Sequence, residues 1–123
     1  MTSPETVDAL YSVGHWLLEQ SRHHDAKHVF RSMLAMAATD ERGWLALGAC
    51  HEETAELDKA ARLYALAPAA CGTAPRCHVA LARVLRKLDR DDEAENAYAR
   101  AADLAEDAGD DALVSIIAAE RAS

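Results

Sequence analysis

The sequence has little of what most non-helical folds require. Aromatic residues make up only 5% of the chain, and it contains five glycines and three prolines. A protein built from many short strands needs more turn-forming residues and more aromatic and β-branched residues. These shortages, together with abundant alanine, favour closely packed helices. We therefore expect an all-α protein.

Positive charge and long apolar runs are also scarce. The chain has 13 Lys and Arg against 21 Asp and Glu, a formal net charge of −8. This balance argues against a nucleic-acid partner, because binding the phosphate backbone needs a net positive surface. No apolar run approaches the roughly 20 residues of a membrane span, and the first residues do not resemble a secretory signal. We expect a cytoplasmic protein that does not insert into membranes and whose partners are proteins.

Cysteine usage points to the same compartment. The three cysteines, Cys50, Cys71 and Cys77, are odd in number and irregularly spaced. They form neither a disulfide framework nor a Cys-x-x-Cys pair. We expect reduced thiols.

The chain resembles itself at one fixed offset, which carries Gly14 onto Gly48 and Gly48 onto Ala82. Each copy holds a large residue or histidine, then a small residue four positions later, then an alanine, then an aromatic residue. The columns are Leu10, Trp44 and His78; Gly14, Gly48 and Ala82; Ala26, Ala60 and Ala94; and Phe30, Tyr64 and Tyr98. This order is the tetratricopeptide (TPR) pattern, which Trp44-Leu45-Ala46-Leu47-Gly48 matches most closely.

The repeat predicts the architecture of a single domain over 1–123. Three helix pairs at about 7–40, 41–74 and 75–108 would stack into a right-handed solenoid, and a helix at about 111–121 would cap its end. Within each pair, the small residue lets the two helices approach and the alanine lies at their crossing. The aromatic residue fills the gap to the next repeat. The helices are expected at about 5–20, 24–38, 41–53, 58–70, 75–88 and 91–106.

Residues that could support catalysis or metal binding are better explained structurally. His24 and His28 have the i, i+4 spacing of a metal-binding pair, but no third ligand is evident nearby. His78 occupies a packing column, and the acidic residues from Asp89 to Glu95 are well placed to favour a helix N-terminus. No nucleophile, phosphate-loop or zinc motif is present. We expect no enzyme activity, no cofactor and no metal.

The first helices of the three pairs should line a concave groove, as in other TPR proteins. The groove is predicted to be apolar and aromatic at one end and basic at the other, and exposed apolar side chains in a concavity favour a peptide-binding site. The alternative is that these residues pack on the capping helix or on a partner in a homodimer. The candidate peptide-binding residues are Tyr11, His15, Leu18, Leu45, Ala49, Val79 and Arg83. Some TPR proteins hold the C-termini of heat-shock proteins with a clamp of basic and amide side chains. We do not expect that clamp here, because Arg83 is the only residue of this chain that fits it.

Three segments resemble a narrower family, the class II chaperones of type III secretion systems. The segment Asp40–Cys50 carries that family's Leu-Gly-Ala-Cys element, Pro75-Arg76 matches the opening of its third repeat, and Glu93-Ala94-Glu95 matches a later element. The resemblance implies a bacterial cytoplasmic chaperone that holds an extended segment of a hydrophobic translocator in its groove before export, as part of a virulence system. Two features depart from the family: few residues precede the first repeat, and His15 replaces a larger aromatic residue.

Two other functions fit the same sequence. A TPR chaperone of a needle subunit, or of another self-assembling subunit, would grip an amphipathic helix instead of an extended strand. A general TPR adaptor would hold proteins together without acting as a chaperone.

Overall fold

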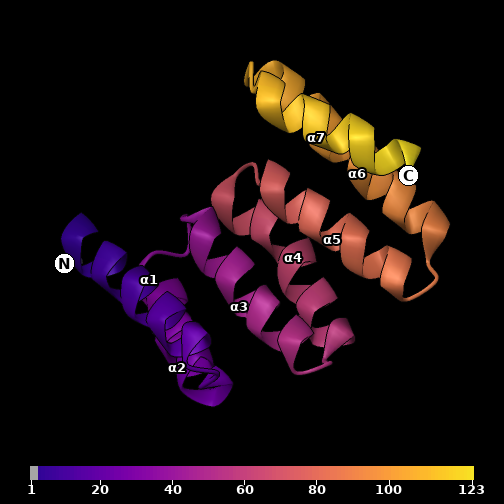
Figure 1. The fold of residues 1–123 in the computed structure, drawn as a ribbon. Helices are drawn as coiled ribbons and strands as arrows, with labels where there is room; N and C mark the ends of the chain where they lie inside the picture. The colour runs from indigo at the N-terminus through magenta and orange to yellow at the C-terminus, as the bar shows by residue number, and fades with distance from the viewer. Residues whose placement is uncertain (1–2) are drawn as a thin grey trace.

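The computed structural model describes residues 3–123, which form seven α-helices and no strand (Figure 1). The helices are α1 (Pro4–Glu19), α2 (His23–Met36), α3 (Glu41–Glu53), α4 (Leu57–Cys71), α5 (Pro75–Lys87), α6 (Asp91–Asp107) and α7 (Asp111–Ala122). The all-α prediction is confirmed. Every helix end lies within two residues of its predicted position.

Local sequence explains where several helices begin. The Ser3 hydroxyl accepts a hydrogen bond from the Thr6 amide ahead of Pro4. Asp40 caps α3 through the Arg42 amide, and Asp110 caps α7 through the Leu113 amide. These side chains satisfy backbone donors that have no partner within the helix.

The turn inside each helix pair has a left-handed residue at the same position in all three pairs. Ser21, Ala55 and Asp89 all adopt a left-handed backbone, with φ of 58°, 61° and 59°. The repeat places these three residues in one column, so the same turn closes all three pairs. None of them is a glycine, the residue whose presence normally signals this conformation.

The helices stack one pair after another, and the two ends of the chain lie at opposite ends of the array (Figure 1). Three apolar clusters follow one another along it. The first joins α1, α2 and α3, the second joins α3, α4 and α5, and the third joins α5, α6 and α7. Each cluster thus depends on contacts between neighbouring pairs, as expected of a solenoid.

The packing columns explain the tight pairing of helices, with one correction. A Cβ added at Gly14 would overlap the Phe30 ring, and one at Gly48 would overlap the Tyr64 ring. The aromatic side chain therefore lies over the glycine of its own pair, and does not serve only to fill the gap to the next pair. In the third pair, Ala82 and Tyr98 are both buried.

The other structural positions are also packed. Ala26, Ala60 and Ala94 are at most 1% exposed. Trp44 is half-buried at the edge of the second cluster, where its indole N–H donates to the Ala38 carbonyl at 2.8 Å.

The last helix continues the register of the first helix of each pair. Arg42 contacts Asp8 of α1 at 2.8 Å, and Arg76 contacts Asp110 at the start of α7 at 3.4 Å. Both ion pairs join residues that are 34 positions apart. The assignment of repeat boundaries at 40/41 and 74/75 stays a prediction.

Candidate functional site: a groove lined by α1, α3 and α5

A cavity of about 560 Å³ lies across the first helices of the three pairs. We call it the concave groove. Five of the predicted peptide-binding residues line it: Tyr11, His15, Leu45, Ala49 and Arg83. Residues that are far apart in the sequence thus meet on one surface because the repeat places them in the same columns.

Two predicted residues lie elsewhere. Val79 is only 2% exposed and belongs to the third apolar cluster, so it stabilises the fold and does not line the groove. Leu18 is half-buried against the first cluster. In place of Val79, the groove is lined by the next residue, Ala80, and on α3 Ala46 lines it together with Leu45. On α5 the predicted column therefore lies one residue before the residue that lines the groove.

The aromatic end of the groove is held in place by its neighbours. The Tyr11 and His15 rings meet edge to face, with centroids 4.5 Å apart, and His15 also contacts Phe30. The Arg42 guanidinium lies 4.9 Å from the centre of the Tyr11 ring and is itself fixed by Asp8 and Asp40. Its hydrogen bond to Asp40 lowers the pKa of that carboxyl. Tyr11 is therefore stacked against a cation whose position two carboxylates set.

Polar groups cross the middle of the groove. The Tyr64 hydroxyl donates to Glu52 Oε2 at 2.6 Å, and Lys87 Nζ lies 3.1 Å from Glu52 Oε1. Burial, and then this hydrogen bond, raise the pKa of Tyr64, so its hydroxyl stays a donor. Glu52 is thus held from two sides, by a helix of its own pair and by the next pair.

The basic end is neutralised by the chain itself. Arg83 pairs with the Glu120 carboxylate, which also accepts a hydrogen bond from the Tyr98 hydroxyl at 3.0 Å. Arg86 donates to the Glu120 carbonyl at 2.8 Å. The sequence predicted a basic end but not this pairing with α7. An incoming peptide therefore meets a groove whose nearest cations already have partners.

The predicted pair of surface histidines lies close together. The Nε2 atoms of His24 and His28 are 3.3 Å apart. Within residues 3–123, no group of three or more His, Cys, Asp or Glu side chains could hold a metal ion. None of the helices described has both the length and the apolar character needed to cross a membrane.

Solved structures resemble this one over nearly all of both chains. The type III secretion translocator chaperone SycD of Yersinia enterocolitica has 24% identity and a TM-score of 0.85, covering 96% of this chain and 89% of its own. PcrH of Pseudomonas aeruginosa, bound to the chaperone-binding region of PopB, has 25% identity and a TM-score of 0.82, covering 96% of both chains. SycD bound to a peptide of the translocator YopD has 23% identity and a TM-score of 0.73, covering 97% of both.

The chain has the fold of the type III secretion translocator chaperones. The resemblance predicted from its Leu-Gly-Ala-Cys, Pro-Arg and Glu-Ala-Glu segments is confirmed. The sequence matches no family model and no curated protein sequence. The structural matches named above are chaperones and not enzymes.

Proposed function

We propose that this protein is a bacterial cytoplasmic chaperone that keeps a hydrophobic type III secretion translocator soluble before export. The observation that carries the proposal is the concave groove, in a chain whose fold matches PcrH bound to the chaperone-binding region of PopB. In the proposed complex, an extended segment of the translocator lies across α1, α3 and α5. The protein would act by binding alone, with no catalysis and no cofactor.

The groove offers small hollows for apolar side chains. Tyr11 and Leu45 occupy the same column of α1 and α3, and Ala49 lies one helical turn beyond Leu45. An apolar side chain in each hollow would bury about 100 Å², which contributes about 2–3 kcal/mol at ~25 cal/mol per Å². Alternate residues of an extended segment can fill such hollows in turn. Because Arg83 and Lys87 are already paired, we expect the client's apolar residues to supply most of its affinity.

The proposal is tested by the double substitution Tyr11→Ala, Leu45→Glu. We expect it to weaken client binding by at least about tenfold, which corresponds to about 1.4 kcal/mol. The measurement is co-expression with a type III secretion translocator, followed by titration of that translocator's chaperone-binding segment. Ala49→Arg, which fills the groove without removing a packed side chain, should act in the same direction.

The matched control is Leu66→Glu, which changes an apolar residue that is 58% exposed and does not line the groove. It should leave client binding unchanged. Circular dichroism must show that all variants keep their helices. A folded double variant that still solubilises the translocator would refute groove binding.

The other two functions predict different results in the same experiment. A needle-subunit chaperone would solubilise an amphipathic helical subunit and not a translocator. A general adaptor would solubilise neither. Size-exclusion chromatography with light scattering would show whether the chaperone acts as a homodimer, a possibility that the sequence left open.

A further inference from the structure

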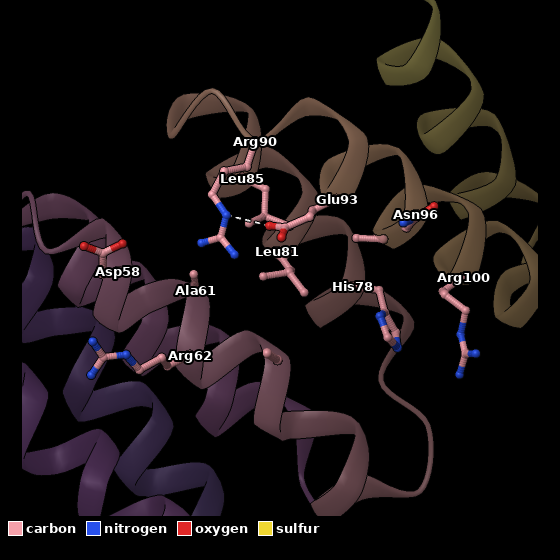
Figure 2. A pocket seen from close by; sticks show the side chains of 12 residues that line it. Asp58, Ala61, Arg62, His78, Leu81, Leu85, Arg90, Glu93, Asn96 and Arg100 are labelled. Atoms are coloured by element: carbon pink, nitrogen blue, oxygen red, sulfur yellow. Dashed lines mark hydrogen bonds and ion pairs between the residues drawn. The ribbon is translucent and has the colours of Figure 1, made fainter.

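A second cavity, larger than the concave groove, lies apart from it. It has a volume of about 740 Å³ and lies between α4 and α6, above α5 (Figure 2). We call it the α4–α6 furrow. On α5, His78, Leu81 and Leu85 face the furrow, whereas Ala80, Arg83 and Lys87 face the groove. The two cavities thus use different faces of the same helix.

The repeat shows why this furrow is open. One repeat earlier, the equivalent space lies between α2 and α4, where larger side chains stand. Lys27 replaces Ala61, Trp44 replaces His78, and Leu63 replaces Ala97. Lys27 also spans the gap, with its Nζ 2.7 Å from Glu56 and 3.0 Å from Thr54. The α4–α6 furrow lacks these fillers and is left with a floor of leucine and alanine.

The lining of the furrow holds three arginines and two carboxylates, Asp58 and Glu93, and two of the arginines form no ion pair within residues 3–123. Arg62 on α4 and Arg100 on α6 lie on opposite sides of the hollow (Figure 2). Within the part of the chain that the structure describes, neither forms an ion pair, whereas Arg90 at the end of the furrow pairs with Glu93. Two such arginines beside an apolar floor contrast with the net charge of −8.

We propose that the α4–α6 furrow binds an amphipathic helix of a partner protein, with an apolar stripe flanked by acidic residues. The stripe would pack on Leu81, Leu85 and Ala97, and carboxylates on its two sides would meet Arg62 and Arg100. A helix fits this surface because the furrow runs between two helices, into which a third can pack as helices do in bundles. An extended strand turns alternate side chains to opposite faces and so presents no such flanked stripe.

The probe for the test is a fluorescein-labelled amphipathic peptide of about 18 residues, about 27 Å long as a helix. Leucine and alanine form one face, and glutamates flank that face on both sides. A second peptide has lysine in place of every glutamate. We expect saturable binding of the acidic peptide, at least about tenfold tighter than that of the lysine peptide. Amide chemical shifts should change along α4 and α6 and not around Tyr11 and Leu45.

Two sets of variants locate the site. Arg62→Glu with Arg100→Glu should reverse the preference between the two peptides. His78→Trp with Ala97→Leu, which copies residues that this chain already packs between α2 and α4, should abolish binding of both. Arg31→Glu is the matched control: it removes an exposed arginine that the repeat aligns with Ala65, and it should change nothing.

Several results would overturn the inference. They are an absence of saturable binding, equal affinity for the acidic and lysine peptides, shift changes confined to the concave groove, or an equal effect of Arg31→Glu. Tighter binding of an extended proline-containing peptide at the furrow would also refute it. None of these results bears on the proposed chaperone function, because that function is tested by substitutions in the concave groove.

Discussion

Two glycines of α3 differ in what a methyl group would meet. At Gly48 an added Cβ would overlap the buried Tyr64 ring, whereas at Gly43 it would lie 3.2 Å from the tip of the flexible Leu34 side chain. Tyr64 cannot move aside easily, because its hydroxyl is bonded to Glu52. The same substitution should therefore destabilise the protein at Gly48 but not at Gly43.

We expect Gly48→Ala to lower the free energy of unfolding by about 1–3 kcal/mol through overpacking. Gly43→Ala should be neutral or stabilising by up to about 1 kcal/mol, because alanine favours the helix. Urea denaturation followed by circular dichroism measures both. Equal effects of the two substitutions would mean that the close approach of Gly48 and Tyr64 does not limit the packing of α3.

His78 should make stability depend on pH. Burial, and then the nearby Arg100, lower the pKa of its imidazole, so the fold favours the neutral ring. This preference for the neutral ring contributes fully to the free energy of unfolding above the pKa of an unfolded histidine, about 6.5. The contribution is lost as the pH falls below that value. We therefore expect His78→Leu to lose less stability than the wild type between about pH 7 and pH 5, in urea denaturation at each pH. Identical profiles would show that the ring is accommodated equally well in both charge states.

At the scale of elements, α7 is held by a few polar contacts at its end and by Leu113 and Ile117 in the third cluster. The Glu120 carboxylate forms an ion pair with Arg83 and accepts a hydrogen bond from the Tyr98 hydroxyl. The Glu120 backbone carbonyl accepts a hydrogen bond from Arg86. These contacts lower the pKa of Glu120, and the hydrogen bond from Arg83 has the largest effect. The contribution of this carboxylate is therefore full above the pKa of a free glutamate, about 4.3, and is lost as the pH falls below it.

We expect Glu120→Gln to weaken the docking of α7 by about 1 kcal/mol, a modest cost because Arg83 is half exposed. Amides of α7 should then exchange with solvent about fivefold faster, while those of α3 stay unchanged. The control is Glu95→Gln, which breaks the exposed pair between Glu95 and Arg121. An equal increase in exchange after both substitutions would mean that the Glu120 contacts are ordinary surface pairs.

The sequence predicts the elements better than their connections. Periodicity and caps place the seven helices, because Ser3, Pro4, Asp40 and Pro75 mark helix starts chemically. The left-handed turn at Ser21, Ala55 and Asp89 carries no glycine, so no local signal marks it. The contacts of α7 with α5 could have been found by continuing the register of the repeat, since Glu120 lies one repeat length after Arg86.

The sequence also predicts part of the candidate site, again because of the repeat. A repeat fixes which column faces the groove, so Tyr11, His15, Leu45, Ala49 and Arg83 line one cavity, and their part in peptide binding stays a prediction. It does not fix how deeply each residue lies, which is why Val79 was assigned to the groove although it is buried. The α4–α6 furrow depends on which side chains are short, and this can be read only after the helices are aligned in space.

For the whole molecule, stability is divided among three clusters and has no common centre. Cys50 is buried in the first cluster, which α1 and α2 complete, and Cys77 is buried in the middle one. Burial raises the pKa of Cys50 to about 11, and it also raises the pKa of Cys77. A thiol reacts as the thiolate, so neither should react until its cluster opens.

We expect Cys50 to be alkylated faster than Cys77 in native conditions, because the end pair α1–α2 has one neighbour and can detach while the middle pairs stay packed. Pulsed alkylation with iodoacetamide and peptide mass spectrometry measures both rates, in a protein whose half-buried Cys71 is changed to Ser. Ala26→Gly, at a fully buried position of α2, should speed the reaction of Cys50 but not that of Cys77. Equal rates for the two thiols before and after this substitution would show instead that the three clusters open together, as in a two-state domain.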